Sequence, residues 1–392
     1  MRRFIMVSAA AGLLVAASTF AATGVAAASA PLTITADPAS AIPAGHNWGF
    51  NDFFPRTISV HRGATIQFSI QGFHTATLLP SGVAASTARK TLGLIKSDAD
   101  DTTPNPNGSS HLEENLGSLF PMPGGCGSSA HPCAFNGTAP VSSGAPLSAP
   151  VPPFNVKVTA PVGFYRFACL IHPNMEGWLA VVPQAFHPTT KSDLNATVHA
   201  QVLADRHAGF VAEAAANVVH SHLNPDGTRT WIGTAGTSSP NGHVAVNEML
   251  PHKISIHRGD KVLWVSRAVN EPHTITFPTD IGTDMLPWCE NGATDTPATP
   301  TVIPPTGPQD FTCGGPPVEI ELDGGNGVSH VTSKSTVSDS GIVASKAELA
   351  GFGLPSTAAS AKWTVSFSGA ARTTYHFVCQ IHEGMAGVIA VH

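Results

Sequence analysis

Two short segments of this 392-residue chain carry the same metal-binding side chains at the same spacing. Residues 169–175 have the pattern Cys-x2-His-x2-Met, and residues 379–385 repeat it in the second half of the chain. A thiolate, an imidazole and a thioether are all ligands of soft or borderline metal ions. The pattern therefore predicts one metal site near the end of each half.

Each half also has a histidine on an earlier predicted strand, His74 in the first and His273 in the second. With this residue added, each half offers one thiolate, two imidazoles and one thioether. Sulfur favours Cu(I) and nitrogen tolerates Cu(II), so this combination is the ligand set of a blue-copper electron-transfer centre. With the cysteine at the end of a strand and a tight loop after it, the Cys, His and Met side chains of the motif could all turn inward onto one ion.

The elements that must position these residues are repeated as well. Residues 58–63 and 254–259 are alternating strands that end in the same His-Arg-Gly turn. The only tyrosines of the chain, Tyr165 and Tyr375, each stand four residues before the repeated cysteine. Because side chains alternate along a strand, each tyrosine shares one face with the next phenylalanine and the cysteine, and we expect that face to be the core.

The pattern of short strands and frequent turns predicts an all-β protein made of two antiparallel sandwiches. We expect domains at residues 31–185 and 219–392. Between them, the segment 186–218 contains an Ala-rich stretch, Ser192 to Asn217, that predicts a linker helix. In each half a long segment, roughly 81–153 and 278–361, is rich in Pro, Gly, Ser and Thr and reads as elaborated loops.

Residues 1–30 have the features of a signal peptide: two arginines, an apolar run and a small-residue end at Ala28-Ser29-Ala30. We therefore expect a secreted, periplasmic or cell-envelope protein, with no stable membrane span in the mature chain. The formal net charge of −6 offers no basic surplus, which argues against DNA or RNA as a partner.

The six cysteines divide into two groups. In an exported protein, Cys126 with Cys133 and Cys289 with Cys313 predict one disulfide in each insertion. A small metal site from Cys126, His131 and Cys133 is the alternative for the first pair. The two motif cysteines then stay unpaired, and a free thiol in an oxidising compartment is a liability unless a metal occupies it.

At these residues the chain resembles the cupredoxin family of blue copper proteins. Pro272-His273 with Phe277 is similar to the first-ligand strand of plastocyanins, and both Cys-x2-His-x2-Met loops have the short spacing of amicyanins. The insertions are longer than in small members of the family, and Phe73 stands where a proline precedes His273. The resemblance implies two tandem Greek-key β-sandwiches that bind two type 1 copper ions. The implied ligands are His74, Cys169, His172 and Met175 for one ion, and His273, Cys379, His382 and Met385 for the other.

The function we expect is electron transfer by Cu(I)/Cu(II) cycling, with a redox protein or small molecule as donor or acceptor. The solvent-facing edge of His172 or His382 would be the electron port. Copper buffering or delivery is an alternative, but such proteins use Met-rich or Cys-rich tracts, and the seven methionines here are not clustered.

A two-domain copper oxidase or nitrite reductase is the other alternative. In those families a histidine beside the copper-binding cysteine leads to a second, catalytic copper. The residues beside the two cysteines are instead Ala168, Leu170, Val378 and Gln380. A catalytic copper would need an interface site in an oligomer, built from His220, His222, His243 or His252.

Overall fold

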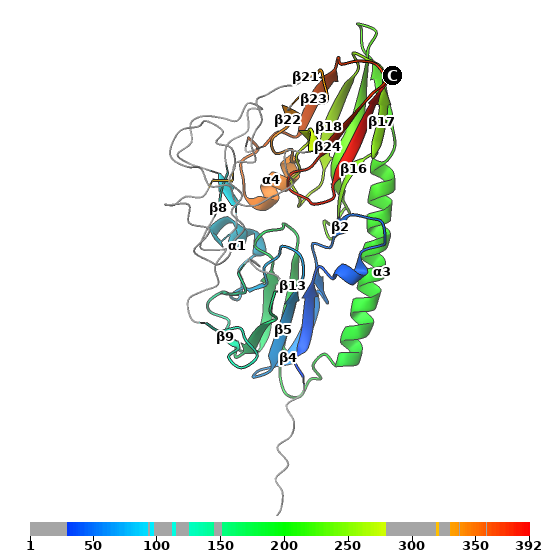
Figure 1. The fold of residues 1–392 in the computed structure, drawn as a ribbon. Helices are drawn as coiled ribbons and strands as arrows, with labels where there is room; N and C mark the ends of the chain where they lie inside the picture. The colour runs from blue at the N-terminus through cyan, green and yellow to red at the C-terminus, as the bar shows by residue number, and fades with distance from the viewer. Residues whose placement is uncertain are drawn as a thin grey trace, which may run out of the picture. The chain divides into compact units, whose positions relative to one another are not determined.

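The computed structural model describes residues 30–92, 95–97, 112–114, 125–144, 151–279, 319–320, 330–336, 338–357 and 359–392. Residues Pro31–His392 form one compact unit. The predicted signal peptide, up to residue 29, and the predicted Cys289–Cys313 disulfide lie outside the described residues. The fold is mainly β, as expected, with three α-helices and one short 3-10 helix (η1, Ala39–Ala41) in the described part of the chain (Figure 1).

The first half forms two five-stranded sheets. One has the order β3 (Phe53–Phe54), β1 (Leu32–Ala36), β5 (Thr65–Ile70), β11 (Phe154–Val158) and β9 (Cys133–Phe135). The other has the order β10 (Val141–Ser142), β6 (Thr77–Leu78), β12 (Gly163–Ala168), β13 (Glu176–Val182) and β4 (Thr57–His61). Phe68 of the first sheet and Phe167 of the second belong to one buried cluster, so the two sheets make a sandwich.

The second half repeats this arrangement. One sheet has the order β2 (Trp48–Gly49), β16 (Ala245–Leu250), β15 (Arg229–Ser238), β18 (Lys261–Arg267), β23 (Lys362–Phe367) and β21 (His330–Val331), with β14 (His220–Leu223) paired to β15. The other has the order β17 (Lys253–Ile256), β25 (Ala386–Val391), β24 (Thr373–Val378), β19 (Thr276–Phe277) and β22 (Ser338–Asp339). Trp264 and Phe377 pack against each other between these two sheets.

The strands that carry the motifs have the same neighbours in both halves. The strand before each cysteine, β12 or β24, pairs antiparallel with the strand after it, β13 or β25. That second strand then pairs parallel with β4 or β17. The expected inward face is confirmed, because Tyr165 and Tyr375 are buried together with the phenylalanine and cysteine that follow each of them.

The helix predicted from the Ala-rich stretch is present as α3 (Lys191–Ala216). It begins with a capping box, in which Thr190 and Asp193 each accept a hydrogen bond from the other's backbone. The helix contacts β15, β16 and β3. Strand β2 of the first half also pairs with β16 of the second, so the chain on both sides of α3 contributes to the same sheet. Among the described residues, no helix combines the length and apolar character needed to cross a membrane.

The described parts of the two insertions contain helices and strands where the composition predicted loops. The first contains α1 (Ala85–Leu92), and the second contains α4 (Lys346–Phe352). Strands β7 (Ile95–Ser97), β8 (Leu112–Glu114) and β20 (Glu319–Ile320) form a small sheet that joins the two insertions. Cys126 and Cys133 form the predicted disulfide, which excludes the alternative metal site with His131.

Candidate metal centre

The fold brings together the predicted donors of the first half. His74 lies just before β6, and the loop from Cys169 connects β12 to β13. The Cys169 Sγ is 3.6 Å from His172 Nδ1 and 3.9 Å from His74 Nδ1, and the two Nδ1 atoms are 2.8 Å apart. All three residues are buried. Three potential ligand atoms thus converge on one point at the end of the first sandwich.

The second half forms an equivalent group from His273, Cys379 and His382. The ligand atoms of these residues all lie within 4.8 Å of one another. Cys379 Sγ is 3.7 Å from His382 Nδ1, and the rings of His273 and His382 have centroids 4.8 Å apart. Six of the eight predicted ligands therefore form two clusters with the same composition.

The backbone makes equivalent hydrogen bonds to the two sulfur atoms. Cys169 Sγ accepts hydrogen bonds from the N–H groups of Thr75 and Ile171, each at 3.4 Å. Cys379 Sγ accepts them from Thr274 at 3.3 Å and Ile381 at 3.4 Å. Hydrogen bonds of this kind hold a ligand in place and tune the metal that it binds.

A threonine in each half locks the ligand loop to the strand that carries the first histidine. Thr75 Oγ1 accepts a hydrogen bond from Leu170 N at 2.7 Å, and Thr274 Oγ1 accepts one from Gln380 N at 2.8 Å. These threonines directly follow His74 and His273, so each fixes the two ligand-bearing segments relative to each other. The spacing of the motifs gave no sign of this role.

Met175 and Met385 close the two loops. Each is buried, and each accepts a backbone hydrogen bond at 2.9 Å from the motif cysteine, Cys169 or Cys379. Each also donates its backbone N–H to the motif histidine, at 3.4 Å to His172 and 3.2 Å to His382. Their role as metal ligands stays a prediction.

The histidines of each cluster favour the ionised form of its cysteine. Burial opposes ionisation of Cys169, but His172 and His74 beside its sulfur outweigh burial and hold the pKa of the thiol well below its usual value. The same balance, with His382 and His273, holds the pKa of Cys379 well below its usual value. Both cysteines are thus set up as thiolates, the form in which cysteine binds metals.

The residues present fit a thiophilic, imidazole-binding metal ion. Both ring nitrogens of His273 are buried and have no hydrogen-bond partner among the described residues. An orphaned buried imidazole is costly unless something else binds it. Gly236, in a left-handed conformation, backs this ring so closely that a Cβ there would lie 1.8 Å from His273 Nε2. The ring is therefore held tightly in place without a protein partner for its nitrogens.

A cavity of about 870 Å³ separates the outer edges of the two clusters. Its lining includes His74, His172, His382 and the carboxylate residue Glu271. Glu271 Oε1 is 3.1 Å from His172 Nε2, and Oε2 is 3.2 Å from His382 Nε2. The two ring edges expected to face solvent therefore face one shared glutamate.

The charge of Glu271 is balanced by these rings. Burial disfavours its ionised form, but His172 and His382 outweigh burial and hold the pKa of the carboxyl well below its usual value. In the metal-free protein burial lowers the pKa of both imidazoles, but the negative Glu271 and cysteine sulfur overcome it. They raise the pKa of His172 to about 10 and that of His382 to about 9.

Glu271 was missed at the level of sequence. It lies two residues before His273, in the segment Asn270-Glu271-Pro272-His273, where the first half has Gly72. That difference between the repeats was the available signal. Nothing in the spacing indicated that the side chain reaches both histidine loops.

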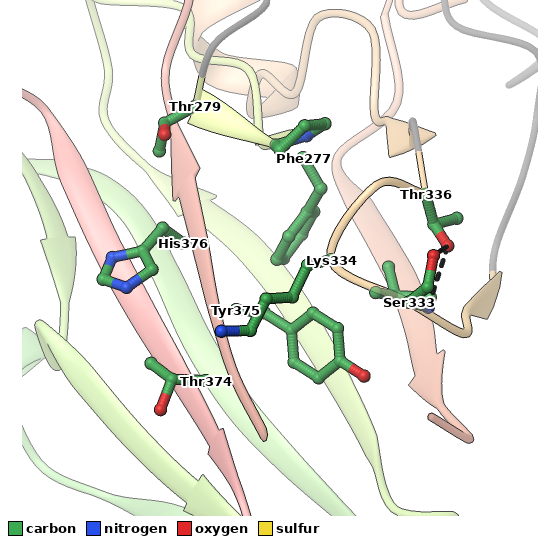
Figure 2. A pocket seen from close by; sticks show the side chains of 10 residues that line it. Phe277, Thr279, Ser333, Lys334, Thr336, Thr374, Tyr375 and His376 are labelled. Atoms are coloured by element: carbon green, nitrogen blue, oxygen red, sulfur yellow. Dashed lines mark hydrogen bonds between the residues drawn. The ribbon is translucent and has the colours of Figure 1, made fainter. Parts of the chain in front are cut away.

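A smaller cavity of about 210 Å³ lies elsewhere in the second sandwich, lined by residues of β19, β24 and the segment 331–336. Figure 2 shows Phe277, Tyr375 and Lys334 around it, with Ser333 and Thr336 joined by a hydrogen bond. None of the eight predicted ligands lines it.

Two histidines considered for an interface site already have protein partners. His243 lies 3.9 Å from Asp52 and 3.8 Å from Asp205, the two carboxylates that also bind Arg56. His252 Nε2 is 3.2 Å from Glu248.

No known protein family matches the chain, and no characterised protein matches it in sequence. Among solved structures, the chain is similar to the oxidised plastocyanin of Dryopteris crassirhizoma, at 18% identity and a TM-score of 0.18, over 38% of this chain and 99% of plastocyanin. It is similar to the reduced auracyanin of Roseiflexus castenholzii at 16% identity and a TM-score of 0.20, over 40% and 99% of the two chains. A Cu-containing nitrite reductase from Thermus scotoductus is similar over 86% of this chain and 59% of the reductase, at 13% identity and a TM-score of 0.18. All three are cupredoxin-fold proteins, the family that the sequence motifs resemble.

Proposed function

We propose that this chain is an exported electron carrier that binds two type 1 copper ions, one in each half. The observation that supports the proposal is the duplicated convergence of one thiolate and two imidazoles. His74, Cys169 and His172 meet in the first half, and an identical set meets in the second.

Copper fits this donor set better than other common metals. Thiolate and thioether ligands favour Cu(I), while imidazoles also suit Cu(II). The eight residues that would hold the two ions are His74, Cys169, His172, Met175, His273, Cys379, His382 and Met385. Copper, when bound there, supplies one-electron cycling between Cu(I) and Cu(II).

Other residues of the chain stabilise the thiolates and fix the positions of the donors. Two N–H groups bond each sulfur and partly neutralise the thiolate. Burial of both cysteines excludes water from the sulfur donors. Because Thr75 and Thr274 fix the ligand loops, the donor geometry should change little between the two oxidation states. A small rearrangement keeps the barrier to electron transfer low.

The same proposal implies in which compartment the protein works and what kind of redox partner it has. Export places the chain outside the cytoplasm, in the periplasm, cell envelope or medium. The donor and acceptor of electrons would be redox proteins or small redox molecules in that compartment.

The direct test is copper loading. Metal-free protein titrated with Cu(II) should become intensely coloured through thiolate-to-copper charge transfer and should take up two coppers per chain. Zinc, which has no redox chemistry, should bind without colour and serves as the control. A colourless copper-loaded protein would contradict the proposal.

A further inference from the structure

Glu271 has one carboxylate oxygen within hydrogen-bond distance of a histidine in each donor cluster. Its Oε1 lies 3.1 Å from His172 Nε2, and its Oε2 lies 3.2 Å from His382 Nε2. Asn51 donates a further hydrogen bond to Oε1 at 2.8 Å. Residues far apart in the chain thus meet on one carboxylate.

Both histidines are oriented in the same way toward this carboxylate. In each ring, Nδ1 faces the cysteine sulfur of its own cluster, at 3.6 Å for His172 and 3.7 Å for His382. Nε2, on the other side of each ring, faces Glu271. The two imidazoles therefore stand in series, with the carboxylate between them.

Burial makes these contacts strong. Glu271 is only 7% exposed and His172 only 6%. Hydrogen bonds from an imidazole N–H to an ionised carboxylate are among the stronger ones in proteins, and a low local dielectric strengthens them further. Solvent competes little for the His172 side of the link and more for the His382 side, where the histidine side chain is 16% exposed.

The repeat provides this carboxylate only once. The position that matches Glu271 in the first half is Gly72, in the left-handed conformation at φ +70°. A Cβ there would lie 2.5 Å from Asp37 Oδ2 and 3.2 Å from the His74 ring. Any side chain at this position would be strained and would have to displace Asp37, and Gly72 supplies no carboxylate, so the two clusters share Glu271.

The segment that carries Glu271 is fixed by α4. Ser345, the N-cap residue of this helix, donates its hydroxyl to the Ala268 carbonyl at 3.0 Å. On the other side of Glu271, His273 and Val343, which lies two residues before Ser345, exchange backbone hydrogen bonds at 3.3 and 2.7 Å. The backbone on both sides of the carboxylate is thus anchored.

We infer that Glu271 is the electron route between the two metal sites, through the path His172 to Glu271 to His382. This inference rests on the proposed function. With copper held by both donor sets, the transfer would be a one-electron exchange that oxidises the metal of one half and reduces that of the other, while no bond or proton of the chain changes place. Glu271 acts through the two histidines and is a positioning residue for both.

The test compares the wild-type chain with Glu271→Ala and Glu271→Gln. Fully oxidised, copper-loaded protein is reduced by a fast pulse with less than one electron per chain, and the redistribution between sites is followed by absorbance. Its first-order rate, independent of protein concentration, should fall by about tenfold or more in Glu271→Ala and less in Glu271→Gln, which keeps one acceptor oxygen. Glu248→Gln, a buried carboxylate in the same half that contacts neither cluster, is the matched control and should leave the rate unchanged.

A second measurement uses the metal-free protein. The Nε2 protons of His172 and His382 should exchange slowly with solvent in NMR spectra of the wild-type chain, and both should exchange fast in Glu271→Ala. An unchanged redistribution rate in a Glu271→Ala protein that still binds two coppers, or fast exchange in the wild type, would overturn the inference. A chain that binds no copper would instead contradict the proposed function, while the NMR comparison would still test the link.

Discussion

In the first half, Asp37 Oδ2 lies 3.5 Å from the Nε2 of His74, whereas in the second half the Nε2 of His273 packs against Gly236 and has no hydrogen-bond partner among the described residues. The surroundings shift the pKa values of these two histidines in opposite directions. Burial lowers the pKa of both, but Asp37 and Cys169 overcome it at His74, whose pKa is raised, while that of His273 is lowered.

The helices next to the two clusters also differ in the charge of the side chain that each buries. In the first half, Arg89 of α1 is buried and its Nη1 donates a hydrogen bond to the Cys169 carbonyl at 3.3 Å. In the second half, α4 buries the acidic Glu348 beside the segment of Glu271. The two halves thus share their donors and the backbone hydrogen bonds to the sulfur atoms, while the charged groups just outside the donors differ. Two copper sites in these frames should therefore have different reduction potentials.

The largest effect is expected from removing one thiolate at a time. Cys169→Ser should abolish copper binding in the first half and leave one coloured copper per chain, and Cys379→Ser should do the reverse. The two spectra should sum to that of the wild type, and metal analysis with visible and electron paramagnetic resonance spectra would check this. Loss of both coppers in either variant would show that the halves do not bind independently.

The buried acid of the second half should make stability depend on pH. Burial raises the pKa of Glu348 to about 8 from its usual 4.5, so the folded state favours the protonated form. Its stabilising contribution is complete below pH 4.5 and is lost as the pH rises through 8.

Glu348→Gln stays neutral and keeps a side chain suited to the capping box. Urea unfolding should show the variant more stable than the wild type at pH 9, by up to about 5 kcal/mol, with a smaller difference at pH 5. An equal difference at both pH values would mean that Glu348 ionises normally in the folded protein.

The smallest effect concerns the buried base of the first half. The positive charge of Arg89 disfavours Cu(II) over Cu(I) nearby, so Arg89→Met should lower the potential of the first site and leave that of the second unchanged. A tenfold change in the equilibrium constant corresponds to about 59 mV for one electron, which voltammetry resolves. Lys90→Met removes the same charge from an exposed position of α1 and should shift neither potential. A shift in the potential of the second site instead would contradict this prediction, because it would show that Arg89 acts on the other half.

Much of the fold followed from local patterns. Alternation in the segments 58–63 and 254–259 marked strands with one buried face, and the structure places β4 and β17 there. The Ala-rich stretch marked α3 to within one residue at each end. The helices α1 and α4 were not expected, because a turn-rich composition hides short helices that are held mainly by tertiary contacts.

The donors that occur together can be read from the sequence, because the spacing Cys-x2-His-x2-Met is local and appears twice. The residues that face the core can be read from it as well, because strand periodicity follows from backbone geometry. The folded chain was needed to see that the rings of His172 and His382 face one another across Glu271. That arrangement depends on how the two halves pack, and no local pattern encodes a contact among residues 172, 271 and 382.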